Sequence, residues 1–125
     1  MAGVMFTPST YGSGAQEDSD WVDLTLLNSW VNFGTGHPPA QYRLLGGVVY
    51  IKGVIKSGTV TSGTVLANLP VGCRPLENLI FGLMTSPGTV AVRVDVTSAG
   101  NITVMSTGAS TAWLSICVPP FIAEQ

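Results

Sequence analysis

The sequence predicts a single all-β domain, an antiparallel β-sandwich or β-barrel of about seven to eight strands. From Trp21 onward, β-branched and aromatic runs alternate with clusters of Gly, Pro, Asn and Ser every eight to twelve residues or so, a spacing typical of sandwiches and barrels. No stretch repeats its apolar residues with the 3.6-residue period of an amphipathic helix. With 125 residues, the chain is long enough to bury one hydrophobic core.

Residues 1–20 are rich in Gly, Ser, Thr and acidic residues and show neither a helical nor a strand period. They predict a flexible or extended leader, with the folded domain over residues 21–125. Within that domain, Gly46-Gly47 is expected to form a turn or bulge, and Gly53 a second irregular point. The expected elements are a first strand or bent pair over 21–33, a strand pair over 41–56, and strands over 59–69, 78–85, 89–96, 102–106 and 111–118.

Residues 89–96 form the clearest strand, because valines occupy every second position from Val90 to Val96. These valines are expected to face the core, as are the alternating apolar residues of the two strands that follow. If the last three strands pair as a meander, their polar residues share one outer face. That face would present Arg93, Asp95, Thr103, Met105, Trp113, Ser115 and Cys117.

Trp113, Arg93 and Asp95 are the best binding candidates on this face. An indole ring can stack on a pyranose, while a carboxylate and a guanidinium hydrogen bond to its hydroxyl groups. The alternative, which the sequence favours, is that Trp113 fills a subunit interface beside an ordinary surface ion pair. His37, between Gly36 and Pro38, is predicted on an exposed loop, either within reach of a ligand or simply solvated.

Three further predictions concern aromatic and basic residues. Residues 41–43 and Tyr50 either line a groove or pack half-buried along their strands. Trp21 and Trp30 are assigned to the core or to a seam between subunits. Arg74 is expected to hold a loop by hydrogen bonding to backbone carbonyl groups or to a nearby carboxylate.

Charged residues make up 10% of the chain and hydrophobic residues 46%, so apolar side chains are in surplus and predict a homo-oligomer. A net charge of −2 without a basic cluster argues against a nucleic-acid partner. The longest nearly apolar stretch, residues 44–51, is too short to insert across a membrane, and the chain is expected to be soluble. Cys73 and Cys117 are expected to be free thiols, and neither a metal site nor a cofactor is predicted.

The sequence also argues against an enzyme. Glycoside hydrolysis needs two carboxylates across a cleft, and the only carboxylates outside the termini are Asp23, Glu77 and Asp95. The sequence contains no nucleophile elbow, zinc-binding motif or phosphate-binding glycine loop.

Several segments between Leu24 and Pro75 match a known pattern. They are Leu24-Thr25-Leu26-Leu27-Asn28-Ser29-Trp30, Pro39-Ala40-Gln41-Tyr42-Arg43, residues 48–56, and Leu69-Pro70-Val71-Gly72-Cys73-Arg74-Pro75. This succession resembles the C-terminal head domains of bacteriophage tail-fibre and receptor-binding proteins, over roughly residues 21–118. The resemblance implies a homotrimeric head that sits on the phage virion and recognises saccharides of the bacterial surface. The resemblance identifies no ligand-binding residue in this sequence. Because the leader is short, the chain is expected to be either a fragment of a longer fibre or a stand-alone virion protein.

Three functional hypotheses are open at this point. The first is a phage receptor-binding domain that binds a bacterial surface glycan. The second is a structural virion component, such as a capsid decoration or head-fibre protein, without a glycan ligand. The third is a small accessory module for glycan degradation.

Overall fold

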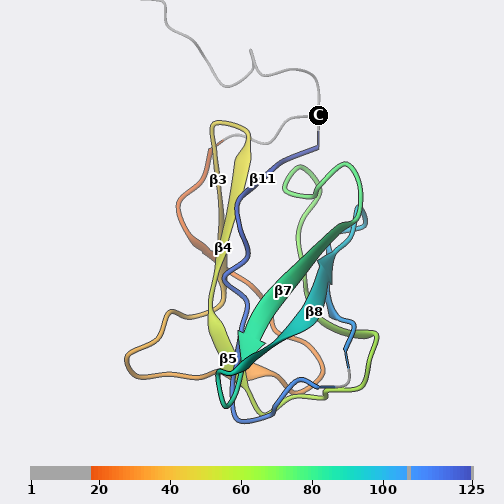
Figure 1. Cartoon of the computed structure of the whole chain (residues 1–125). Helices are drawn as coiled ribbons and strands as arrows, with labels where there is room; N and C mark the ends of the chain where they lie inside the picture. Colours follow the sequence, from red (N-terminus) through yellow and green to blue (C-terminus); the bar gives the residue numbers. More distant parts are fainter. Residues whose placement is uncertain (1–17, 107, 125) are drawn as a thin grey trace, which may run out of the picture.

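The computed structural model describes residues 18–106 and 108–124, which form two antiparallel β-sheets around one hydrophobic core (Figure 1). This part of the chain contains no helix. Strand order is β1-β3-β4-β11 in the four-stranded sheet and β2-β5-β10-β7-β8-β9-β6 in the seven-stranded sheet. The all-β prediction is confirmed.

The four-stranded sheet consists of β1 (Val22–Asp23), β3 (Gln41–Leu45), β4 (Val48–Lys52) and β11 (Phe121–Ile122). The seven-stranded sheet consists of β2 (Val31–Asn32), β5 (Val54–Lys56), β6 (Thr64–Asn68), β7 (Leu79–Thr85), β8 (Val90–Val96), β9 (Asn101–Val104) and β10 (Leu114–Ser115). Four of these strands have only two residues, and seven have three or more, which matches the expected seven to eight.

Gly53 marks the point where the chain passes from one sheet to the other. It separates β4, in the four-stranded sheet, from β5, in the seven-stranded sheet. Its φ of +151° is one that L side chains rarely adopt, and a Cβ here would lie 2.8 Å from the Cα of Ala40. The irregular point expected at Gly53 is therefore the sheet crossing. Gly46-Gly47 forms the turn of the β3–β4 hairpin, also as expected.

The inward face of β8 follows the predicted alternation from Val92 to Val96, and β9 adds Ile102 and Val104 to the same core. Val90 differs, because 52% of it is exposed. The paired register of β8 with β9 stops at Val94, so no neighbouring strand covers the beginning of β8 on that side.

The predicted meander is wrong for its last strand. β10 pairs with β5 and β7, so that β7 lies between β10 and β8. Nine residues separate Val104 from Leu114, far more than an antiparallel hairpin needs, and this connection crosses to the other side of β7. The strand expected over 111–118 is reduced to the two residues of β10, Leu114–Ser115.

The two tryptophans expected in the core or in a seam have different positions. Trp30 is only 3% exposed and donates its indole N–H to the carbonyl oxygen of Thr59 at 3.0 Å. Trp21 is 37% exposed and lies on the outside of the four-stranded sheet. The core assignment is confirmed for Trp30, whereas Trp21 is a surface residue of the described domain.

Most of the expected leader, residues 1–17, lies outside the described residues. Its last part contacts the β3–β4 hairpin. The amide of Ser19 donates to the carbonyl oxygen of Leu44 at 2.8 Å, and the amide of Gly46 donates to Asp18 Oδ1 at 2.8 Å. Within the described ranges, the structure offers no helix with the length and apolarity needed to cross a membrane.

Arg74 anchors the loop between β6 and β7, as predicted. Its Nε donates to the carbonyl oxygen of Leu69 at 2.8 Å, and its own carbonyl accepts from the amide of Glu124 at 2.7 Å. The carboxylate of Glu124 in turn accepts from the amide of Gly72 at 2.8 Å. These bonds tie the C-terminal residues to the loop.

We expect the two free thiols to differ in reactivity, because Cys73 is buried and Cys117 is exposed. Burial raises the pKa of the Cys73 thiol, and the negative charge of Glu124 raises it further, so the reactive thiolate is scarce at about pH 8. Iodoacetamide labelling followed by peptide mapping should modify Cys117 in the native protein and Cys73 only after unfolding. A Cys117→Ser variant is the control. Equal labelling rates for both thiols would contradict this burial.

Candidate functional site

Arg93 and Asp95 form a closed ion pair on the outer face of β8. Arg93 Nε lies 2.9 Å from Asp95 Oδ1 and Nη2 lies 2.9 Å from Oδ2, so both carboxylate oxygens are engaged. The Asp95 side chain is 11% exposed and that of Arg93 48%. These hydrogen bonds and the carboxylate charge raise the pKa of Arg93. Arg93 and Asp95 therefore lie close together, as the sequence predicts. Because both oxygens of the Asp95 carboxylate accept from Arg93, fewer groups of the pair are free to bind a ligand.

Trp113 is separated from this pair. It directly precedes Leu114, which lies opposite Thr85, and its ring is close to Gly88 in the turn between β7 and β8. Arg93 lies opposite Gly82, further along β7. From strand spacing and rise per residue, Trp113 and Arg93 are about 15 Å apart. Both residues lie on the same face of the seven-stranded sheet. Because β7 lies between β10 and β8, they do not form one small site.

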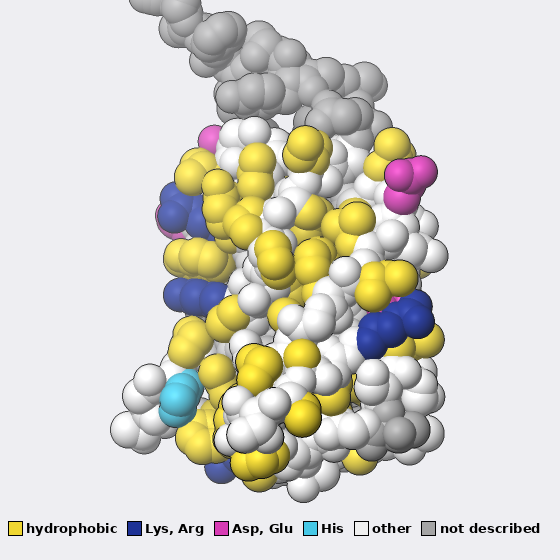
Figure 2. Space-filling model, viewed as in Figure 1, with side chains coloured by type: hydrophobic (Ala, Val, Ile, Leu, Met, Phe, Trp, Pro, Cys, Tyr) yellow, Lys and Arg dark blue, Asp and Glu magenta, His cyan; other side chains and the backbone are white. Residues whose placement is uncertain are grey.

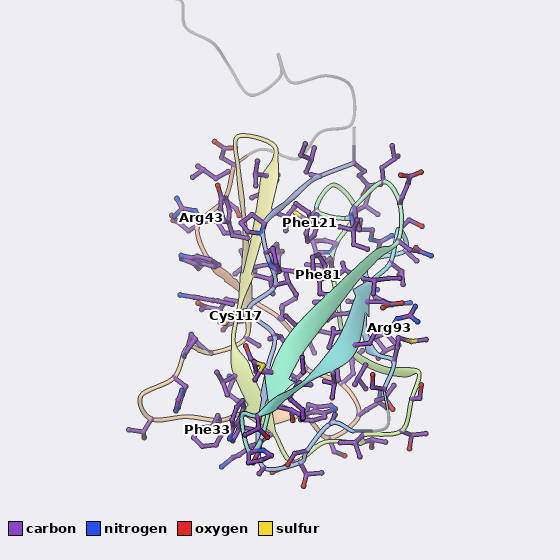
Figure 3. The ribbon with its side chains drawn as sticks, in the orientation of Figure 1. Phe33, Arg43, Phe81, Arg93, Cys117 and Phe121 are labelled. Carbon is purple, nitrogen blue, oxygen red and sulfur yellow. The ribbon has the colours of Figure 1, made fainter. Side chains whose placement is uncertain are left out.

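His37 occupies the exposed loop between β2 and β3, where the sequence places it. Its ring packs edge-on against Phe33, with centroids 4.9 Å apart, and Lys56 Nζ lies 5.4 Å from the Phe33 centroid. Figure 3 shows Phe33 at the lower left and Arg93 on the opposite side of the molecule. The four predicted site residues therefore do not form one cluster.

A second polar surface lies on the four-stranded sheet, and we call it the β3–β4 outer face. The inward side chains of its strands include Leu44, Val49 and Ile51, so the alternate residues point outward. The strand register, extended by one position through Trp21, places polar and aromatic residues in two of its outward rows. These two rows are Asp23, Gln41 and Lys52, and next to them Trp21, Arg43 and Tyr50; a third row, nearer the hairpin turn, is the apolar Leu45, Val48 and Ile122.

Specific contacts order this face. Lys52 Nζ lies 4.3 Å from the centroid of the Trp21 ring, a cation–π contact. Gln41 Nε2 donates to Asp23 Oδ1 at 2.8 Å, and Arg43 Nε donates to the carbonyl oxygen of Ser19 at 2.9 Å. Figure 3 shows Arg43 extending outward from the sheet, away from β7 and β8.

The sequence contains part of the signal for this face. A turn at Gly46-Gly47 sets the hairpin register that places Arg43 opposite Tyr50 and Gln41 opposite Lys52. Sequence reasoning considered residues 41–43 and Tyr50 as a possible groove but missed Lys52 and Trp21. Trp21 joins the face only because β1 pairs with β3, a contact between distant segments.

The three carboxylates considered from the sequence, Asp23, Glu77 and Asp95, lie on different parts of the domain. Asp23 lies on the outer face of the four-stranded sheet and Asp95 on that of the seven-stranded sheet, with the core between them. Glu77 is exposed in the loop before β7. Among residues 18–106 and 108–124, no three His, Cys, Asp or Glu side chains gather closely enough to hold a metal ion.

No protein-family model matches the sequence, and no curated protein matches it. The fold does match a solved structure, the receptor binding protein (gp15) of Listeria phage PSA. The TM-score is 0.67 at 18% sequence identity, and the match covers 85% of this chain. This chain spans 66% of the length of that protein. The two proteins therefore share a fold over most of this chain.

Proposed function

We propose that this chain is a receptor-binding domain of a bacteriophage virion that attaches to host cells by recognising a saccharide of the bacterial surface. The observation that carries the proposal is the fold shared with a phage receptor-binding protein over 85% of this chain. The resemblance of residues 24–75 to phage tail-fibre heads points the same way. The proposal needs no catalytic step.

The domain is proposed to act as a homotrimer. Several large hydrophobic side chains are more than 60% exposed, namely Val71, Leu76, Ile80 and Ile122. Figure 2 shows hydrophobic side chains gathered along the middle of the visible face, with charged ones at its edges. Covering such surface with a second copy would be favourable. Three linked copies also raise avidity when their individual saccharide sites are weak.

Fluorescently labelled protein is expected to bind saturably to some strains of a bacterial panel that includes Listeria. Because the proposed receptor is a saccharide, removing cell-wall polysaccharide should abolish binding, whereas protease treatment of the cells should not. Flow cytometry measures both, with heat-unfolded protein as the control. Binding to purified capsids but to no cells would instead favour the structural virion component.

The same assay tests Trp113, Arg93, Asp95 and His37, which this proposal treats as separate candidate contacts. Alanine variants at Trp113 and His37 are the informative ones, because Arg93 and Asp95 hold each other and would change together. Sedimentation at micromolar concentration should give a trimer. A monomer would contradict the assembly part of the proposal.

A further inference from the structure

The β3–β4 outer face combines aromatic surface with unspent hydrogen-bonding groups. Arg43 uses only Nε, for Ser19, and its two terminal nitrogens have no partner among the described residues. Asp23 accepts from Gln41 through Oδ1, which leaves Oδ2 open in the described part of the chain. Arg93 and Asp95, by contrast, bond to each other through two parallel hydrogen bonds that engage both oxygens of the carboxylate. The β3–β4 outer face therefore offers a ligand more free hydrogen-bonding groups than the Arg93–Asp95 pair does.

The charge of this face favours an anion. It carries the cations Arg43 and Lys52 against the single carboxylate of Asp23, on a chain whose net charge is −2. Two further carboxylates lie at the edge of the sheet, outside these rows: Asp18 accepts from the amide of Gly46 at the hairpin turn, beyond the row that contains Arg43, and Asp20 is exposed next to Trp21. A guanidinium with two free terminal nitrogens can bind a carboxylate or a phosphate bidentately.

The dimensions suit a short stretch of glycan. Three adjacent strands span about 10 Å, and the two rows of outward residues are about 7 Å apart. The contact with Trp21 holds Lys52 in place before a ligand arrives, and the bond to Ser19 does the same for Arg43. This order reduces the conformational entropy that binding would otherwise cost. Tyr50, in the same row as Arg43, adds aromatic surface for a sugar ring.

We infer that the β3–β4 outer face binds an acidic saccharide, with Arg43 and Lys52 holding its carboxylate or phosphate group while Trp21 and Tyr50 contact the sugar. The inference rests on the proposed function and names the class of glycan. The carboxylate of a uronic acid and the phosphate of a phosphodiester-linked glycan present the same anionic chemistry to the two cations, and the test below separates them.

Biolayer interferometry of the full chain would use polygalacturonate as the carboxylate probe, yeast phosphomannan as the phosphate probe and dextran as the neutral control. Binding is expected to one or both acidic probes, none to dextran, and a marked weakening from about 50 to about 500 mM NaCl. Arg43→Gln and Lys52→Gln should each weaken binding about tenfold. Lys56→Gln is the matched control, because Lys56 also lies over an aromatic ring but on the other sheet, and it should bind as wild type does.

Thermal unfolding shows whether each variant folds. Arg43→Lys provides a second variant that keeps the charge but loses the planar fork, and an intermediate loss is expected. Binding to polygalacturonate alone identifies a carboxylate ligand, and binding to phosphomannan alone a phosphate ligand. Either result supports the inference provided that the Arg43 and Lys52 variants lose it.

Cell binding separates the two proposals. If wild type binds cells and the Arg43→Gln, Lys52→Gln double variant binds them equally well, this inference is overturned while receptor binding stands. Loss of cell binding in the Trp113→Ala or His37→Ala variant alone would also overturn this inference and leave the receptor-binding function standing. If the acidic probes bind through Arg43 and Lys52 but no cells do, the site stands and the receptor function fails. Binding to neither cells nor probes overturns both.

Discussion

Replacing Gly58 with alanine is expected to lower the free energy of unfolding by about 3 kcal/mol, because a Cβ at this position would overlap the indole ring of Trp30. Trp30 is almost fully buried, and its indole N–H is committed to the carbonyl oxygen of Thr59. The ring therefore cannot withdraw without breaking that hydrogen bond or disturbing the core. Urea unfolding monitored by circular dichroism measures the change.

Gly82→Ala is the matched control for this substitution. Gly82 lies on the outer face of β7, and a Cβ there would meet only the Cβ of Ala91, at an ordinary 3.7 Å. The free energy of unfolding of the Gly82→Ala variant should stay within about 1 kcal/mol of the wild-type value or rise slightly, because alanine is more favourable in a strand than glycine. Equal stabilities of the two variants would show that the Trp30 ring moves aside at little cost.

The parts of the fold that could be predicted from sequence are those set by local chemistry. The β3–β4 hairpin follows from alternating residues on either side of Gly46-Gly47, and β8 follows from its valines. The position of β10 could not be predicted in this way. It depends on a nine-residue connection that crosses β7, and such a connection carries no local signal for the strand with which it will pair.

The same division applies to the candidate sites. Arg93 and Asp95 are two residues apart on one strand, so their proximity follows from strand geometry. The two hydrogen bonds between them do not, because a strand pattern does not reveal which side-chain atoms will bond. The contact between Trp21 and Lys52 requires three strands in the correct order, with β3 between the other two. Long-range pairing of this kind is what the sequence pattern lacks.

Replacing Thr85 with valine is the second change with a large expected effect, a loss of about 2 kcal/mol of stability. The fully buried Thr85 hydroxyl donates to the carbonyl oxygen of Trp113 and accepts from the amide of Ser110, both at 2.8 Å. Valine has nearly the same shape but would leave the Ser110 amide without its partner, at about 1–3 kcal/mol, while the Trp113 carbonyl would keep only its hydrogen bond from the amide of Ser86, at 3.1 Å. Urea unfolding measures the loss, and hydrogen exchange should show a less protected Ser110 amide.

The Thr85→Ser variant separates the contribution of the hydroxyl group to stability from that of the methyl group. It keeps both hydrogen bonds and removes one buried methyl, so a smaller loss of about 1 kcal/mol is expected. A valine variant as stable as the serine variant would mean that the Ser110 amide finds another partner. Because Thr85 holds the Trp113 backbone, the valine variant also tests where the ligand binds. Below its unfolding transition, it should bind cells as wild type does if the ligand occupies the β3–β4 outer face, and more weakly if Trp113 makes the contact.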